Sequence, residues 1–153
     1  MKHREKWSIV FTSFAISNVF VTTLKGLIFT NALRPMSLVD KGYFLHFVDV
    51  IKMYLHHSFP SGHSITAFAV AFTLVLLIKK KNYYKYLFFI TAFLVVFNQI
   101  YLSEHFPIDV IAGVFIGILS TYLSIYLLSL FKKNKFIIED PESILFETEI
   151  YAS

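Results

Sequence analysis

Apolar runs separated by short polar segments dominate the chain. Four of these runs approach or exceed the roughly 20 residues that an α-helix needs to cross the hydrocarbon core of a bilayer. The pattern therefore predicts an all-α fold, an integral membrane helical bundle with about four transmembrane helices. The predicted spans are residues 7–30, 61–78, 83–102 and 107–131.

Small side chains within two of these runs predict close contact between helices. Thr12, Ser13 and Ser17 make the first run unusually polar, and small hydroxylated residues suit helix packing inside a membrane. Gly113 and Gly117 form a Gly-x-x-x-Gly pair in the last run, a pattern that lets two helix backbones approach each other.

Residues 31–60 are the longest segment outside the spans. Within it, residues 43–57 place polar side chains at spacings of three, three and four, which is one face of a helix. This pattern predicts a short amphipathic helix at the membrane interface. A metal site on the same face is an alternative interpretation, since His and Asp are common metal ligands. The residues on this face are His46, Asp49, Lys52 and His56, and the alternative metal ligands are His46, Asp49, His56 and His57.

Composition supports the membrane assignment and excludes some partners. Hydrophobic residues make up 56% of the chain and charged residues 16%. The absence of cysteine excludes disulfides and thiolate metal sites. The net charge is +4, but no basic stripe interleaved with aromatic residues indicates a nucleic-acid partner.

Basic residues occur in three clusters, and with four spans all three fall on one side of the membrane. Because loops rich in Lys and Arg stay in the cytoplasm, both termini are predicted to be cytoplasmic, in a bacterial inner membrane. Residues 1–131 then form one membrane domain, and residues 132–153 form an exposed cytoplasmic tail. A signal peptide is an alternative for the start of the chain, but the apolar run continues to Phe29, which favours a span. The clusters are Lys2, Arg4 and Lys6; Lys79, Lys80, Lys81 and Lys85; and Lys132, Lys133 and Lys135.

The polar turn around His105 lies on the opposite, extracytoplasmic face. Pro107 is well suited to the first position of a helix, so His105 directly precedes that helix and Asp109 lies in its first turn. A carboxylate at this spacing can orient one imidazole nitrogen and leave the other free as base, nucleophile or ligand. The alternative is a polar turn with a purely structural hydrogen bond.

A second turn on the same face, Pro60-Ser61-Gly62-His63, opens the second span. Helix N-termini bind anions through free N–H groups and the helix dipole. Lys25 and Arg34 add positive charge, although headgroup anchoring would also explain them. Two histidines, two cations and an anion site together suit phosphoryl transfer, with one His attacking phosphorus and the other protonating the leaving oxygen.

The order of these motifs resembles the three-part signature of the type 2 phosphatidic acid phosphatase superfamily. The resemblance covers about residues 18–120 and includes the stretch from Ile100 to Gly113. Its membrane members are metal-independent lipid phosphatases without a cofactor, which act on phosphatidic acid, phosphatidylglycerol phosphate, undecaprenyl pyrophosphate or phosphorylated lipid A. Haloperoxidases share the signature, but they are soluble, so the predicted spans argue against one.

The resemblance implies a role for each candidate residue. His105 would be the nucleophile that forms a phosphohistidine, Asp109 would orient it, and His63 would protonate the leaving lipid alcohol. The phosphate oxygens would be held by Lys25, Arg34, Ser61 and Gly62, with Gln99 in the position of a further phosphate-binding residue.

Three features depart from the family pattern. Gln99 stands where the family has a phosphate-binding arginine, and Glu104 adds negative charge beside His105. An alternative function is therefore a weakly active or inactive homologue that binds lipid phosphate or a membrane partner. Eight residues separate Lys25 from Arg34 where six are usual, and the first motif ends the first span instead of the third. Two N-terminal helices are thus expected to be absent, in a fragment, a late start or a reduced homologue, and homo-oligomerisation is left open.

Overall fold

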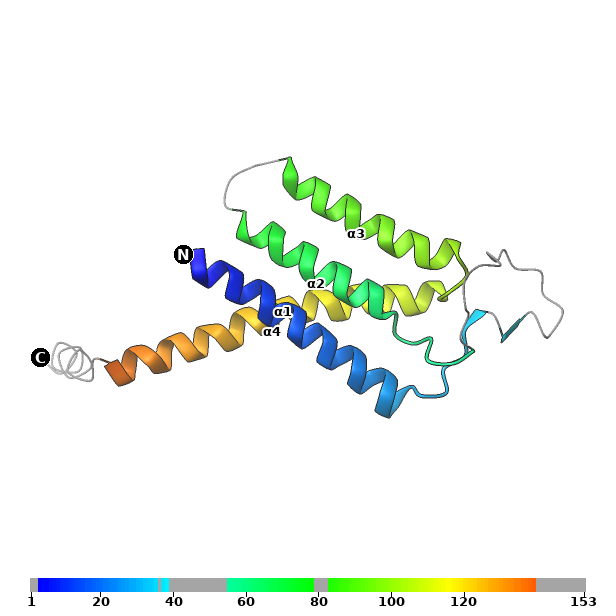
Figure 1. The fold of residues 1–153 in the computed structure, drawn as a ribbon, viewed down its shortest axis with the longest axis horizontal. Coiled ribbons are helices and arrows are strands. Elements are labelled where there is room, and N and C mark those ends of the chain that lie inside the picture. The colour runs from blue at the N-terminus through cyan, green and yellow to red at the C-terminus, as the bar shows by residue number, and fades with distance from the viewer. Residues whose placement is uncertain (1–2, 36, 39–54, 79–82, 140–153) are drawn as a thin grey trace, which may run out of the picture.

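The computed structural model describes residues 3–35, 37–38, 55–78 and 83–139. The described residues form four α-helices and one short π-helix, an element with wider turns than the α-helix (Figure 1). The helices are α1 (His3–Thr23), η1 (Leu24–Ile28), α2 (Gly62–Leu77), α3 (Tyr84–Tyr101) and α4 (Pro107–Glu139). The prediction of an all-α helical bundle is confirmed.

Among the described residues, three helical stretches are long and apolar enough to cross a membrane: Lys6–Ile28, Tyr84–Tyr101 and Pro107–Phe131. The remaining predicted span, residues 61–78, corresponds to α2, an apolar helix of 16 residues. The predicted span 107–131 matches the apolar part of α4, and the helix continues from there to Glu139, so the predicted tail begins as helix. The rest of that tail, residues 140–153, lies outside the described residues.

The predicted interfacial helix over residues 43–57 falls mostly outside the described residues. At its described end, Leu55, His56 and His57 are not helical, and His57 has a positive φ of 61°. The helical spacing that put His56 on a common face with His46 and Asp49 therefore does not extend through residues 55–57. This removes His56 from the predicted face.

α2 is the central helix of the bundle, and it packs against α1, α3 and α4. Gly113 and Gly117 explain the close contact between α4 and α2. A Cβ atom on Gly113 would lie 2.7 Å from the Ser61 carbonyl oxygen, and one on Gly117 would lie 2.5 Å from the Ile65 carbonyl oxygen. Both distances are too short for a side chain, so the predicted role of the glycine pair in helix packing is confirmed.

Hydroxyl groups hold α1, α2 and α4 together in the interior. Ser13 contacts Thr121 at 3.2 Å, and Thr73 bonds both of them at 3.0 Å. Thr12 and Ser124 form a further pair at 2.5 Å between α1 and α4. We refer to these five residues as the hydroxyl cluster. Such hydrogen bonds bind helices to one another where water is absent.

The two ends of the bundle are formed by different helix termini. The start of α1, the end of α2, the start of α3 and the end of α4 lie towards one end (left in Figure 1). The end of η1 and the starts of α2 and α4 lie towards the other. The segments that carry the predicted site residues therefore meet at one end of the bundle.

Candidate active site

The eight predicted site residues all belong to the end of the bundle where α2 and α4 begin. His105 lies in the turn between α3 and α4, and Asp109 in the first turn of α4. The others occupy η1, the segment after it, the start of α2 and the last turn of α3. They are Lys25, Arg34, Ser61, Gly62, His63 and Gln99.

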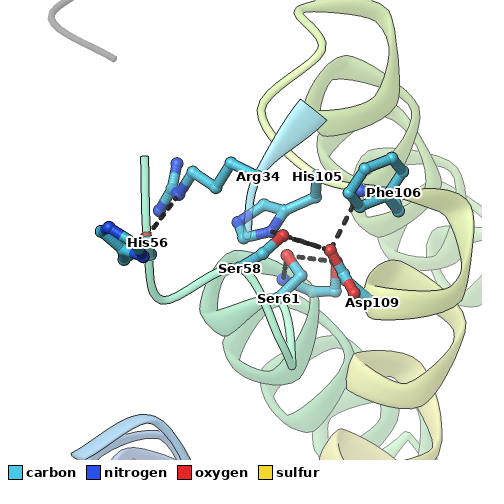
Figure 2. Close-up of polar contacts among 8 residues, drawn as sticks. Arg34, His56, Ser58, Ser61, His105, Phe106 and Asp109 are labelled. Atoms are coloured by element: carbon cyan, nitrogen blue, oxygen red, sulfur yellow. Dashed lines mark hydrogen bonds and ion pairs between the residues drawn. The ribbon is translucent and has the colours of Figure 1, made fainter. Parts of the chain in front are cut away.

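The His105 turn is built by hydrogen bonds of the backbone. The Gln99 carbonyl oxygen accepts from the backbone N–H groups of Glu104 at 3.1 Å and His105 at 3.2 Å. Pro107 begins α4, as predicted, and the Asp109 carboxylate accepts from the backbone N–H of Phe106 at 3.0 Å (Figure 2). This is the acidic half of a capping box, so Asp109 both starts the helix and fixes the residue that follows His105.

The predicted contact between His105 and Asp109 is present, but it is indirect. The Nδ1 atom of His105 lies 3.6 Å from Oδ2 of Asp109, beyond hydrogen-bond distance. Ser58 stands beside both: its hydroxyl donates to Asp109 Oδ2 and lies 3.4 Å from His105 Nδ1 (Figure 2). Since the single hydroxyl hydrogen goes to Asp109, Ser58 accepts from Nδ1–H. The imidazole then carries its proton on Nδ1 and keeps the lone pair on Nε2.

Burial keeps the His105 ring neutral. Only 2% of the residue is exposed, and Asp109 and Ser58 are similarly buried. Desolvation is the main reason that the pKa of His105 falls from 6.5 to about 3. The charges of Lys25, Arg34 and His63 lower it further, whereas a hydrogen bond with the Ser58 backbone opposes the shift. At neutral pH the free nitrogen is therefore an available nucleophile or ligand.

The start of α2 lies directly against this turn. Ser61 caps the helix: its Oγ accepts from the Ser64 backbone N–H at 3.4 Å and from the Ser64 hydroxyl at 2.9 Å. The backbone N–H of Ser61 donates to the Asp109 carbonyl oxygen at 3.0 Å. This bond joins the two motifs that the sequence separates, and it aligns the N-terminal end of α2 with the His105 turn.

Lys25 reaches the same place from η1. A Cβ atom on Gly62 would lie 3.8 Å from Lys25 Nζ, so the ammonium group sits beside the start of α2. The Lys25 carbonyl oxygen also lies 3.2 Å from Nδ1 of His57. The π-helical turn and the bend after it accommodate the longer separation between Lys25 and Arg34 that the sequence shows, since a π-helix takes up an additional residue.

Arg34 is half-buried and held by the segment before α2. Its backbone N–H donates to the Leu55 carbonyl oxygen at 3.0 Å, and its Nε donates to the His56 carbonyl oxygen at 3.2 Å (Figure 2). Both bonds hold the guanidinium group near the His105 ring, where its charge contributes to the lowered pKa of His105.

His63 and Gln99 have contrasting surroundings. His63 is exposed at the start of α2 and close enough to His105 to influence its pKa. Gln99 is 6% exposed, and within the described part of the chain its Oε1 atom is buried without a hydrogen-bond partner. An unpaired buried carbonyl oxygen is costly, so this position is where the site is least well satisfied.

Ser58 is the site residue that the sequence reading missed. Its position, three residues before the Ser61 cap, carries no periodic or capping signal. Only the fold shows that it lies between a histidine and an aspartate more than 40 residues further along the chain.

The comparisons with known proteins agree with this geometry. A family model described as "PAP2 superfamily" matches residues 6–133. The chain belongs to the PAP2 superfamily. Its matched region includes every candidate residue named above, which confirms the family resemblance drawn from the motifs.

Two named proteins are similar to part of this chain. An undecaprenyl-diphosphatase of Sulfolobus acidocaldarius is 34% identical over 93 residues, or 61% of this chain and 42% of the relative. The bacitracin transport permease protein BcrC of Bacillus licheniformis is 37% identical over 71 residues, or 46% of this chain and 34% of the relative. The chain thus matches less than half of the length of either.

A solved structure shows the same fold over a longer stretch. The crystal structure of Aquifex aeolicus LpxE superposes with a TM-score of 0.64 and 30% sequence identity. The match covers 82% of this chain and 70% of that one. The arrangement of helices described above is therefore shared with Aquifex aeolicus LpxE.

Proposed function

We propose that this protein is a metal-independent phosphatase that removes phosphate from a membrane lipid phosphate or diphosphate through a phosphohistidine intermediate. The observation that carries the proposal is the His105 ring. It is neutral, and its Nδ1 is directed to Ser58 and Asp109. Among the described residues, its Nε2 has no hydrogen-bond partner, and it lies beside two cations and a helix N-terminus.

In the proposed reaction, the Nε2 lone pair of His105 attacks the terminal phosphorus, and the bond between that phosphorus and its leaving oxygen breaks. The leaving oxygen belongs to the lipid alcohol in a monophosphate and to the remaining phosphate in a diphosphate. His63 gives a proton to that leaving oxygen, and water then hydrolyses the phosphohistidine to release phosphate. Lys25, Arg34, the Ser61 hydroxyl and the Gly62 N–H stabilise the phosphate oxygens. The Ser61 hydroxyl accepts from Ser64, so its own hydrogen is free to donate. These fixed charges supply what a metal ion supplies in other phosphatases.

The membrane placement follows from the charge pattern. With the Lys and Arg clusters in the cytoplasm, the site opens on the extracytoplasmic face of a bacterial inner membrane. A lipid phosphate in that leaflet would present its headgroup at the level of the α2 and α4 N-termini. The name of the archaeal relative makes a prenyl diphosphate the first substrate to test.

The direct test is phosphate release by the purified protein on a panel of lipid phosphates and diphosphates. His105→Ala should reduce the rate by roughly 10⁴-fold or more, because no other group replaces the nucleophile. His56→Gln is a matched control, since this exposed histidine lies on the same face and has no proposed role. Release by His105→Ala as fast as by the parent would show that the proposal is wrong.

The alternative is a homologue that binds lipid phosphate with little turnover. Gln99 favours it, because its Oε1 is buried without a partner among the described residues and its side chain offers no charge to phosphate. Gln99→Arg should raise kcat/KM by roughly 10²–10³-fold if the site is only weakened, the usual effect of one phosphate-stabilising group. If the parent is inactive on the whole panel and Gln99→Arg does not create activity, the binding function is favoured.

A further inference from the structure

A second chemistry is available at the mouth of the same site. His63, Glu104 and His105 each offer one ligand atom, and these three atoms lie within 4.8 Å of one another. Two ligands of one tetrahedral zinc ion are about 3.4 Å apart, since each bond is about 2.1 Å long. Shifts of about an ångström in the side chains would therefore bring all three onto one ion.

The burial of the three residues suits such an adjustment. His105 is buried and fixed, Glu104 is half-buried, and His63 is exposed. In the part of the chain that the structure describes, neither the His63 ring nor the Glu104 carboxylate has a hydrogen-bond partner. Both side chains can thus turn towards His105 without breaking a hydrogen bond within that part of the chain, and the exposed side gives an ion access from solvent.

His105 already has the surroundings of a metal-binding histidine. Such histidines usually donate the ring N–H that does not bind metal to an oxygen, often of a carboxylate, which orients the ring. Here Nδ1–H is directed to Ser58, which is bonded to Asp109. The tautomer that leaves Nε2 free for phosphorus leaves it equally free for a metal ion.

We infer that His63, Glu104 and His105 form an inhibitory binding site for a divalent transition-metal ion, of which Zn²⁺ is the best fit. Two imidazoles and one carboxylate are a usual zinc ligand set, whereas Mg²⁺ and Ca²⁺ require oxygen ligands. The fourth position is open to water. Lys25 and Arg34 oppose the binding of a cation, and the Glu104 carboxylate offsets part of that charge.

The inhibitory effect rests on the proposed function, but the binding site does not. A bound ion would occupy the Nε2 lone pair of His105 and the acid His63, so neither could act on phosphate. This gives Glu104, which has no role in the proposed catalysis, a function of its own: it makes the site sensitive to metal.

Zinc binding is measured first, without reference to activity. The purified full chain in detergent is titrated with Zn²⁺ against a chromophoric chelator, in a buffer free of phosphate. Glu104→Gln and His63→Gln should each raise the Kd for Zn²⁺ at least about tenfold. Removing a residue that only supports a metal ligand already lowers metal affinity by about 10–100-fold. His56→Gln, the matched histidine control, should leave the Kd unchanged, and Mg²⁺ should not compete.

The inference is overturned if both Glu104→Gln and His63→Gln bind Zn²⁺ as tightly as the parent. It is also overturned if His56→Gln weakens binding equally, if Mg²⁺ competes equally, or if the parent shows no saturable binding. Circular dichroism and gel filtration confirm that each variant remains folded.

Phosphate release then tests the consequence. Zn²⁺ should inhibit the parent reversibly, with full recovery after chelation, and Glu104→Gln should need at least about ten times more Zn²⁺ for the same inhibition. Without metal, Glu104→Gln should be at least as active as the parent, because a negative charge near phosphate is removed. An inactive parent that still binds Zn²⁺ through these residues would contradict the proposed function and support the metal site.

Discussion

Two polar regions interrupt the apolar bundle, and they differ in charge and in how completely their polar atoms are hydrogen-bonded. The hydroxyl cluster is neutral, and each of its five side chains has a partner on another helix or on the backbone. At the candidate active site, Lys25, Arg34 and Glu104 bring charge to one turn, and Gln99 Oε1 is buried without a partner among the described residues. A closed, neutral network holds helices together, whereas a charged and incompletely paired one retains the capacity to bind a ligand.

The largest effect is expected from the glycines of α4, because they support both regions. Gly113→Ala would place a Cβ atom 2.7 Å from the Ser61 carbonyl and 2.8 Å from the Ser64 Cβ, so α4 must move away from α2. Overpacking of this kind costs about 1–3 kcal/mol. We expect a lower Tm in detergent together with at least a tenfold loss of phosphate release.

Gly26→Ala is the matched control, since a Cβ atom there meets nothing within 4 Å. It should change Tm little. An equal loss of Tm in both variants would show that close packing of α2 and α4 is not the cause.

Low pH should destabilise the candidate active site but not the hydroxyl cluster, because of the two regions only the site contains a buried imidazole that titrates. The pKa of His105 is about 3 in the folded chain and about 6.5 when unfolded. Between these values the unfolded chain binds the extra proton, so stability falls as pH falls below 6.5 and is not affected above it. The loss is about 1.4 kcal/mol for each pH unit.

The expected result is that Tm of the parent falls from pH 6.5 to pH 4.5 in the presence of chelator, and that His105→Gln reduces this fall. The same slope in both proteins would show that His105 does not titrate in this way. The hydroxyl cluster has no group that titrates in this range.

The smallest effect concerns the hydroxyl cluster alone. Thr73→Val keeps the shape of the side chain but removes its bonds to Ser13 and Thr121. Hydrogen bonds between membrane helices average about 0.6 kcal/mol and reach about 1.7 kcal/mol. Tm should therefore fall slightly while the rate of phosphate release per folded molecule stays unchanged. A loss of rate without a loss of Tm would mean that the two regions are coupled.

Much of the fold was predictable because long apolar runs in the sequence indicate membrane helices. The predicted start of α4 at Pro107 was correct, since the proline and the capping aspartate are local signals. The predicted end of the membrane span at residue 131 was also correct, but the helix itself continues to Glu139, because nothing in residues 132–139 stops it. Leu55–His57 were predicted to be helical from their spacing, but Leu55 instead accepts a hydrogen bond from the Arg34 N–H, and Ser58, which follows the segment, donates to the Ala32 carbonyl oxygen.

The site was predictable as far as its residues carry charge or begin a helix. His63, His105, Asp109, Lys25 and Arg34 were all placed at one end of the bundle by topology, and the structure brings them together. Ser58 was not predictable, because a single hydroxyl becomes part of the site only through the fold. The π-turn at Lys25 was also missed, since its sequence, LKGLI, does not differ from that of an α-helix end.

The hydrogen bond from the Ser61 N–H to the Asp109 carbonyl joins backbone to backbone. Apart from proline at position 61, which lacks the donor, no substitution removes either of its groups. The spacing between the N-terminal end of α2 and the His105 turn is therefore a property of the main chain. Under the proposed function, the side chains around a lipid headgroup could change, and with them the lipid that is accepted, while the proposed reacting groups keep their alignment.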